Sequence, residues 1–216
     1  MTLAQHFYQL CLDRPDAEFI RHEAKVLSRA EVLDRVRCAV SQFSRELKGD
    51  DWLLASSNRD PVQRVVQMLA ASWLGYRWLL TDTPSALETT ECFDVDTLPK
   101  THIEADGQIR QPAEWPTNRA HWTLYSSGTT GAPKDINLQW SQIEASAEGA
   151  RERLGIDTTD RWLCILSLGH IAGASIVARA CLIGHQIVFG GKFCAEKFHS
   201  LVVETGATVT SLVPTM

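Results

Sequence analysis

Residues 125–134 form the part of the chain whose composition best suits a polyphosphate: Tyr-Ser-Ser-Gly-Thr-Thr-Gly-Ala-Pro-Lys. Gly128 and Gly131 permit backbone angles and close approaches that a Cβ would block, so successive N–H groups can form an anion-binding nest. Lys134 adds a full positive charge, and Pro133 stiffens the approach to it. The hydroxyl donors of the run are Ser126, Ser127, Thr129 and Thr130. The run therefore predicts a phosphate-binding loop.

The spacing of this loop differs from that of a Walker A sequence. A Walker A loop places four residues between its first glycine and a Gly-Lys pair. Here two residues separate Gly128 from Gly131, and Lys134 follows Pro133. The alternative to a phosphate loop is a flexible linker rich in serine, threonine and glycine.

The elements around the loop are those that a phosphate loop needs. Residues 121–125 are rich in strand-forming types, and residues 135–138 read as a short extended exit. Ser141 and Glu144 have the spacing of a capping box, which predicts the start of a helix. Its expected apolar face consists of Ile143, Ala147, Ala150 and Leu154.

The rest of the chain alternates apolar strand patterns with amphipathic helical ones. Helices are expected from Ser28 to near Gly49, from Asp60 and Pro61 to Gly75, and over 174–183 and 195–204. Strands are expected at 51–56, 77–80, 162–167, 186–189 and 207–213. This alternation predicts an α/β fold with parallel-rich sheets covered by helices. Residues 81–119 show little periodicity and read as an irregular connecting segment.

Composition limits the possible functions. A net charge of −5, with scattered basic residues, gives no support for a nucleic-acid partner. No apolar run reaches the ~20 residues of a membrane helix, and the first twelve residues do not resemble a signal peptide. The six cysteines form no CxxC pair, so free thiols in a reducing cytoplasm are expected rather than disulfides or a metal site.

The loop and a second motif together resemble the adenylate-forming superfamily, which includes acyl-CoA synthetases, luciferases and adenylation domains of peptide synthetases. Residues 167–173, Ser-Leu-Gly-His-Ile-Ala-Gly, are similar to its motif Pro-Leu-Phe-His-x-x-Gly. His170 and Gly173 are retained, whereas Ser167 replaces the proline and Gly169 the aromatic residue. Asp135 stands where the superfamily usually has glycine after the lysine. A carboxylate there is unfavourable beside a phosphate unless it points away.

The resemblance implies that ATP and a carboxylic acid react to an acyl-AMP and pyrophosphate. A thiol then takes the acyl group, with CoA as the expected acceptor and a carrier protein as the alternative. It assigns ATP binding to Ser126, Ser127, Gly128, Thr129, Thr130, Gly131 and Lys134. Thr130, Lys134 and His170 are the candidate catalytic residues: a threonine near Mg²⁺, a charge on the phosphates, and a group that orients the acid. No protein metal ligand is assigned. A lone histidine at a strand end can also be just a satisfied polar residue.

The resemblance also implies a domain organisation. Residues 1–216 correspond to part of a large N-terminal AMP-binding domain, with residues 120–216 as its phosphate-loop and acyl-pocket portion. The superfamily's later motifs and small C-terminal domain would lie beyond Met216, so we expect a fragment that is inactive alone. The Ser-Leu-Val-Pro-Thr run at residues 211–215 is similar to o-succinylbenzoate–CoA ligases. A non-catalytic nucleotide-binding fragment is the alternative, and the sequence does not name the acid.

Overall fold

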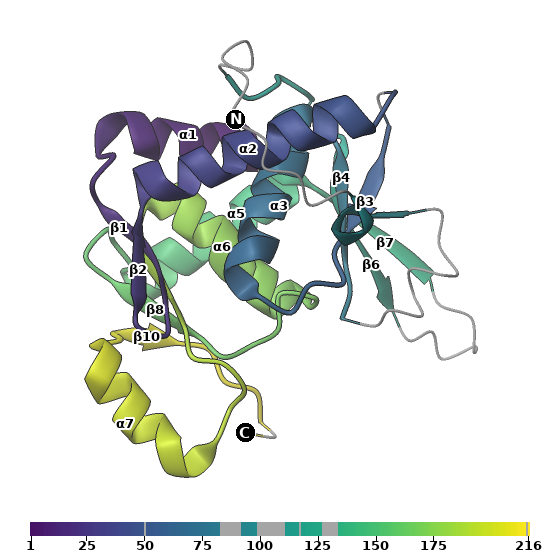
Figure 1. Cartoon of the computed structure of the whole chain (residues 1–216). Helices are drawn as coiled ribbons and strands as arrows, with labels where there is room; N and C mark the ends of the chain where they lie inside the picture. Colours follow the sequence, from purple (N-terminus) through teal and green to yellow (C-terminus); the bar gives the residue numbers. More distant parts are fainter. Residues whose placement is uncertain (50, 83–91, 99–110, 117, 127–133, 215) are drawn as a thin grey trace.

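Two five-stranded sheets lie on opposite sides of a group of helices (Figure 1). The computed structural model describes residues 1–216 except 50, 83–91, 99–110, 117, 127–133 and 215. The helices between the sheets contact one another. Helix α2 packs on α3, α5 packs on α6, and α1 packs on both α3 and α6. The helices are α1 (Leu3–Asp13), α2 (Arg29–Glu46), α3 (Pro61–Leu74), α5 (Trp140–Leu154), α6 (Ile171–Ile183) and α7 (Ala195–Thr205), with a short 3₁₀ turn, η1 (Val95–Thr97).

The first sheet, sheet A, has the strand order β10-β8-β9-β1-β2. Its β1 and β2 form an antiparallel hairpin, and β1–β9, β9–β8 and β8–β10 pair in parallel. The strands are β1 (Glu18–His22), β2 (Lys25–Ser28), β8 (Arg161–Cys164), β9 (Gln186–Phe189) and β10 (Val209–Thr210). Both faces of its centre are covered. Trp162 and Ile187 belong to the main core, whereas Leu163 and Val188 pack with residues of α7.

The second sheet, sheet B, has the strand order β5-β3-β4-β6-β7. Only the β6–β7 pair is antiparallel. The strands are β3 (Leu53–Ala55), β4 (Arg77–Leu80), β5 (Phe93–Asp94), β6 (Ala120–Ser126) and β7 (Lys134–Gln139). The predicted α/β class with parallel-rich sheets is confirmed. Within residues 81–119, however, β5 adds an edge strand that the sequence pattern did not reveal.

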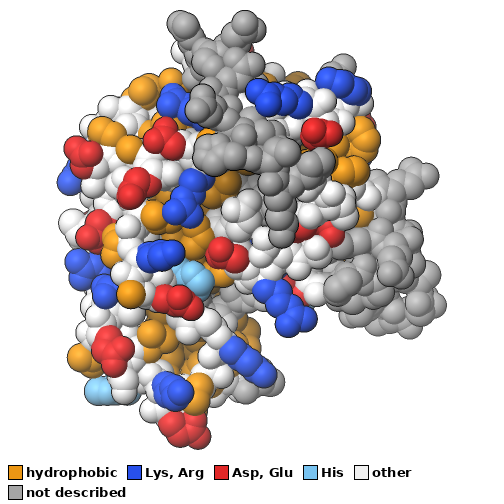
Figure 2. Space-filling model, viewed as in Figure 1, with side chains coloured by type: hydrophobic (Ala, Val, Ile, Leu, Met, Phe, Trp, Pro, Cys, Tyr) orange, Lys and Arg blue, Asp and Glu red, His pale blue; other side chains and the backbone are white. Residues whose placement is uncertain are grey.

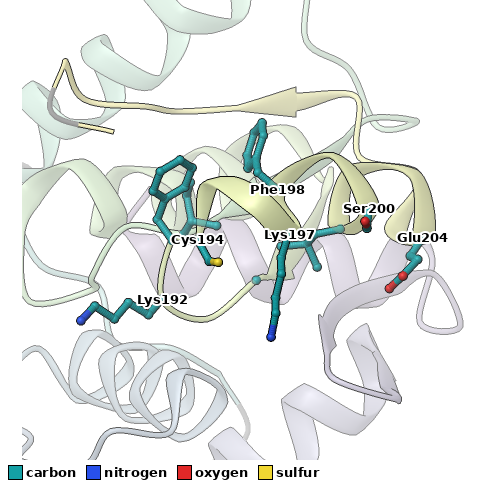
Figure 3. Close-up of a pocket in the computed structure, with 10 residues that line it drawn as sticks. Lys192, Cys194, Lys197, Phe198, Ser200 and Glu204 are labelled. Atoms are coloured by element: carbon teal, nitrogen blue, oxygen red, sulfur yellow. The ribbon is translucent and has the colours of Figure 1, made fainter.

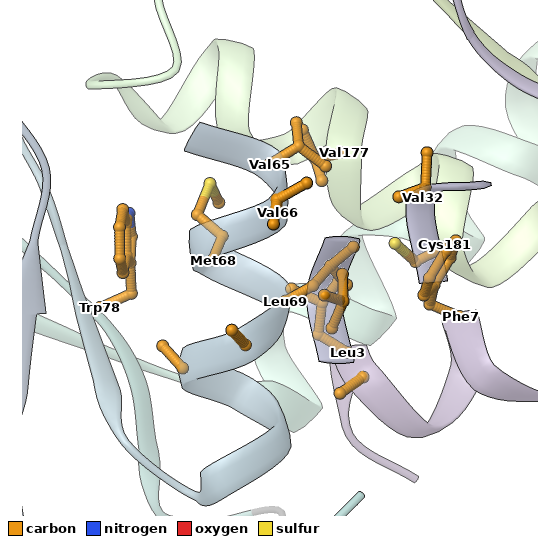
Figure 4. Packing of buried hydrophobic residues seen from close by; sticks show 14 of the residues in the cluster. Leu3, Phe7, Val32, Val65, Val66, Met68, Leu69, Trp78, Val177 and Cys181 are labelled. Carbon is orange, nitrogen blue, oxygen red and sulfur yellow. The ribbon is translucent and has the colours of Figure 1, made fainter. Parts of the chain in front are cut away.

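The main core lies among α1, α2, α3 and α6, where Leu3, Phe7, Val66, Leu69 and Val177 are almost fully buried (Figure 4). The Trp-rich stretch from Trp73 to Leu80 is also core: Trp73, Tyr76, Trp78, Leu79 and Leu80 are all buried. All six cysteines are free thiols. Burial raises the pKa of the Cys11 and Cys164 thiols to about 12, so both behave as apolar side chains.

Helix starts that depend on local caps follow the prediction in two cases. Ser28 and Glu31 form the expected capping box of α2, and Asp60 caps α3 with Pro61 at its first position. Helix α5 is different, because Gln139 and Gln142 form its box, so the predicted cap at Ser141 is wrong by two residues. Leu154 was expected on the apolar face of α5 and is 60% exposed.

The two ends of the chain depart further from the prediction. Helix α1 was not predicted, although Thr2 and Gln5 form a complete capping box before it. The strand expected at 207–213 is limited to Val209–Thr210. A two-residue edge strand leaves most of that apolar segment outside the sheet.

Candidate active site

The β6–β7 hairpin holds the ends of the predicted phosphate loop together. Ser126, the last residue of β6, pairs with Lys134, the first residue of β7. The segment between them contains Ser127, Gly128, Thr129, Thr130 and Gly131, and it lies outside the described residues. The strand, extended segment and helix predicted around the loop are present, because β6 precedes it and β7 leads directly into α5.

Lys134 and Asp135 differ in orientation. Both are exposed at the start of β7. Because neighbouring residues of a strand point to opposite faces of a sheet, the Asp135 carboxylate is directed away from the face that carries Lys134. The carboxylate that replaces the superfamily's glycine therefore does not share a face with the lysine.

His170 lies in the turn between β8 and α6, directly before the first residue of the helix. Its side chain is 76% exposed, and it makes no capping hydrogen bond to α6. Its Nε2 atom lies 3.6 Å from Oδ2 of Asp82. Gly173, the other retained residue of the motif, is in the first turn of α6, where a Cβ would lie 2.2 Å from the carbonyl oxygen of Ser167. Close packing of the helix on its own turn thus requires this glycine.

Asp82 is the centre of a polar cluster that the sequence analysis missed. Arg64 Nη1 donates to Asp82 Oδ1 at 2.7 Å, and Arg64 Nη2 donates to the Thr81 carbonyl at 2.6 Å. The Ser167 hydroxyl donates to Asp82 Oδ2. A charged residue within the apolar pattern of α3 was the available signal, since a buried arginine needs a partner.

The electrostatics of Asp82 favour its ionised form. Burial disfavours the carboxylate, but the hydrogen bonds from Ser167 and Arg64, together with the charges of Arg64 and His170, more than offset burial. The pKa of the Asp82 carboxyl therefore lies below its usual value.

Asp82, the contact partner of His170, and the predicted phosphate loop follow neighbouring strands at the same edge of sheet B. Leu80 of β4 pairs with Leu124 of β6 in the parallel register. Asp82 and Ser126 each follow this pair by two residues, so both lie at the carboxyl ends of neighbouring strands. Ligands of open α/β sheets bind at such carboxyl ends. The sheet thus brings the contact partner of His170 next to the start of the predicted phosphate loop.

A cleft of about 440 Å³ adjoins the β8–α6 turn that carries His170. It lies at the carboxyl ends of β1, β8 and β9 and at the start of α3, and Ser167 and Leu168 form part of its wall. Its lining includes the charged residues Arg59, Asp60, Arg64 and Lys192, and also His22. The cleft is therefore predominantly basic.

A second cavity, of about 390 Å³, lies between α7 and the ends of β8 and β9 (Figure 3). Lys192, Lys197 and Glu204 contribute charged groups, and Phe198 contributes an aromatic wall. It contains none of the predicted site residues. Over the described surface in Figure 2, acidic and basic side chains are interspersed. Among the described residues, no group of three or more histidine, cysteine, aspartate or glutamate side chains is placed to hold a metal ion.

The helix-covered, parallel-rich sheets and the β6–β7–α5 unit define an α/β domain. The sequence profile of the family described as "AMP-binding enzyme" matches residues 14–216 and gives this domain its class, that of the adenylate-forming enzymes. The chain belongs to this family.

Curated relatives include 2-succinylbenzoate–CoA ligases. The protein from Enterococcus faecalis is 35% identical over 136 residues, which cover 62% of this chain and 28% of that relative. The one from Bacillus cereus strain Q1 is 32% identical over 103 residues, which cover 48% and 21%. The alignments thus span less than a third of these relatives' lengths.

Solved structures support the fold. O-succinylbenzoate coenzyme A synthetase from Bacillus subtilis in complex with AMP has a TM-score of 0.83 and 24% identity, covering 98% of this chain and 62% of that one. The same enzyme in complex with ATP and magnesium ion gives a TM-score of 0.81 at 23% identity, covering 98% and 50%. Within the described part of the chain, no helix is long and apolar enough to cross a membrane.

Proposed function

We propose that this chain contributes the phosphate loop and a carboxylate-orienting histidine to an ATP-dependent carboxylate adenylation. The reaction forms an acyl-AMP and releases pyrophosphate, and a thiol then accepts the acyl group. The observation that carries the proposal is the shared edge of sheet B, where β6 delivers the loop and β4 delivers the partner of His170. Family membership over residues 14–216 supports the same chemistry.

The donor set of the loop fits a triphosphate. In this proposal residues 126–131 hold the β- and γ-phosphates through backbone N–H groups and hydroxyls, and Lys134 neutralises their charge. ATP would supply the adenylyl group, and Thr129 or Thr130 would lie near a Mg²⁺ ion that would supply further positive charge for the phosphates. His170 orients the acid's carboxylate for attack on the α-phosphorus. Residues 120–216 are then the phosphate-loop and acyl-pocket portion of the domain.

The names of the relatives suggest the substrates. Those proteins are called 2-succinylbenzoate–CoA ligases, so we propose an aromatic carboxylic acid and CoA for the intact enzyme. A carrier protein bearing a thiol is the competing acceptor. The free cysteines support a reducing compartment, and we propose the cytoplasm.

The test is carboxylate-dependent ATP–pyrophosphate exchange, with 2-succinylbenzoate, benzoate and fatty acids as the acid panel. It is run on the 216 residues and on the full gene product, whether or not that product continues past Met216. Thioester formation is then compared with CoA and with a phosphopantetheinylated carrier protein. Exchange with none of the acids by the full gene product would favour a non-catalytic nucleotide-binding role.

Lys134→Ala tests the assignment of the loop. A charge about 4 Å from a phosphate contributes roughly 4 kcal/mol at an effective dielectric of 20, and exposure reduces this, so exchange should slow by about 10–100-fold. Lys134→Arg keeps the charge and should retain more activity. Lys25→Ala, which removes an exposed lysine on β2, is the matched control. An unchanged exchange rate in Lys134→Ala would refute the role of this lysine.

A further inference from the structure

The turn that carries His170 is fixed to sheet B through one carboxylate. Ser167 at the start of the turn donates to Asp82 Oδ2, and the Gly169 N–H donates to the Ser167 hydroxyl at 3.0 Å. Asp82 is fixed in turn by Arg64 from α3, whose side chain is only 8% exposed. The contacts connect β4, α3 and the β8–α6 turn in one network, so the position of the turn depends on Asp82.

The two departures from the superfamily motif are the residues that admit this carboxylate. Ser167 supplies the hydroxyl that binds Asp82, which a proline could not do. At Gly169 a Cβ would lie 2.3 Å from Asp82 Oδ1 and 2.6 Å from the Thr81 carbonyl carbon. An aromatic side chain built on this backbone would therefore collide with Asp82 and with the end of β4. Asp82 can therefore occupy this position because residue 167 is a serine that binds it and residue 169 is a glycine that leaves it space.

Asp82 also faces the imidazole itself. The distance of 3.6 Å from Oδ2 to His170 Nε2 is within ion-pair range and longer than a hydrogen bond. Within the described residues, no other acidic side chain comes within ion-pair distance of this ring. The ring is otherwise largely exposed, and Nε2 is the ring nitrogen that faces Asp82, so Nδ1 is the nitrogen available to a ligand.

We propose that Asp82 is a positioning residue for the adenylation reaction: anchored by Arg64 and Ser167, it holds His170 so that the free ring nitrogen meets the carboxylate of the acid. The inference rests on the proposed function of His170. Asp82 touches neither substrate in this arrangement, and its effect passes through the histidine. Loss of Asp82 should therefore affect the acid rather than ATP.

The test is a double-mutant cycle with Asp82→Asn and His170→Ala, measured by ATP–pyrophosphate exchange in the full gene product with acid and ATP varied separately. Asp82→Asn should lower kcat/KM for the acid about tenfold and leave the KM for ATP within about twofold. In the His170→Ala background the same change should have almost no further effect. Asp82→Glu, which keeps the charge, should restore part of the activity.

Failure of the proposed role of His170 and failure of the positioning by Asp82 would give different kinetic results. If His170→Ala leaves the kinetics for the acid unchanged, the role of His170 is refuted, and positioning by Asp82 with it. If His170→Ala matters but Asp82→Asn retains its full effect in that background, only the positioning is refuted. Asp51→Asn, which removes an exposed carboxylate paired with Arg77 and Arg119 before β3, is the control and should behave as wild type.

A second readout does not depend on activity or on the stability of Asp82→Asn. The ¹³Cγ resonance of Asp82 is titrated in the 216-residue chain and in its His170→Ala and Ser167→Ala variants. Because Ser167 and His170 both lower the pKa of Asp82, each variant should raise its midpoint. A midpoint unmoved by His170→Ala would show that the imidazole does not interact with Asp82 and would overturn the proposal. Ser167→Ala should also weaken acid use, less than Asp82→Asn, only while His170 is present.

Discussion

Gly169 occupies a position where a side chain has no room. A methyl group there would lie closest to the Asp82 carboxylate and the backbone of Thr81, and that backbone cannot move without displacing the end of β4. This differs from a glycine that is needed for a left-handed angle, because Gly169 does not have a positive φ. Glycine is required at position 169 for a steric reason, because residues 81 and 82 occupy the space that a side chain would need.

We expect Gly169→Ala to destabilise the protein by about 1–3 kcal/mol, the usual range for forcing extra volume into a packed site. Gly149→Ala is the matched control, since Gly149 is exposed in α5 and has open space around its Cβ position. That change should stabilise by about 0.5–1 kcal/mol, because alanine is the better helix former. Urea unfolding measures both. Equal effects of the two substitutions would contradict the close approach of Asp82.

Single-residue chemistry in this site was only partly predictable from the sequence. The loop residues and His170 are recognisable because their types and spacing lie within short motifs. Arg64 is indicated only as a charge within the apolar pattern of α3, which does not name its partner. Asp82 is not indicated at all, because it contacts Ser167 across 85 residues and nothing local to Asp82 points to that contact. The apparent defects of the motif at 167 and 169 become intelligible only with that distant contact.

At the level of elements, the loop after β3 is fixed by a half-buried carboxylate on η1. Asp96 accepts from the Ser56 hydroxyl at 2.6 Å, from the Asn58 N–H at 2.8 Å and from Gln67 Nε2 at 2.9 Å. Burial opposes its ionisation, but these hydrogen bonds outweigh burial and hold the pKa of Asp96 below its usual value. The edge strand β5 is thereby joined to both β3 and α3.

Asp96→Ala should destabilise the protein by about 2–3 kcal/mol, because several donors would lose their acceptor and remain partly buried. Asp34→Ala is its control: Asp34 is an exposed member of a pair with Arg37 on α2, and its loss should change stability by less than about 0.5 kcal/mol. Both values come from denaturant midpoints at neutral pH. A loss below about 1 kcal/mol for Asp96→Ala would mean that water replaces the carboxylate without penalty.

Elements with strong local signals were the ones predicted well. Helices α2 and α3 have an N-cap and a regular apolar face in the sequence, and both begin where predicted. The start of α5 was missed because Gln139 is an unusual capping residue that competes with a better-looking serine two positions later. Strand β10 is short because only Val209 and Thr210 pair with β8, and pairing with a strand distant in the sequence cannot be seen in a local pattern.

At the level of the whole molecule, two histidines are buried without charge. His121 lies among tryptophans, stacked on Trp115 with ring centroids 4.5 Å apart, and burial lowers its pKa to about 3. His185 packs near Trp162, and burial lowers its pKa to about 4 although Gln186 and Asp160 act in the opposite direction. Both groups favour the folded state only while they remain neutral.

Because of these two histidines, acid should lower the free energy of unfolding. The unfolded histidines take up protons near pH 6.5, whereas the folded ones do so only near pH 3–4, so stability is complete above about pH 6.5 and falls as the pH is lowered. At pH 5 each contributes a loss of about 2 kcal/mol. Asp82 and Asp96, whose folded pKa values are depressed, lose their contributions only below about pH 4.

His121→Phe should therefore reduce the loss of unfolding free energy between pH 7 and pH 5 by about 2 kcal/mol. The comparison is the difference between the two pH values within each variant, which removes any effect of phenylalanine on packing. His199→Gln, at an exposed position of α7, is the control substitution. An unaltered difference in His121→Phe would mean that His121 becomes protonated without unfolding.

The order of strands in the two sheets has a consequence for synthesis on the ribosome. Sheet B is built from residues 53–139, so its strands become available one after another. Strand β1 is made first, but its parallel partner is β9, where Ile20 pairs with Ile187. At roughly 5–20 residues per second this wait is on the order of ten seconds or more. During that time β1 lacks its parallel neighbour, so Phe19 and Ile20, which are fully buried in the finished fold, remain without part of their cover while the chain is being made.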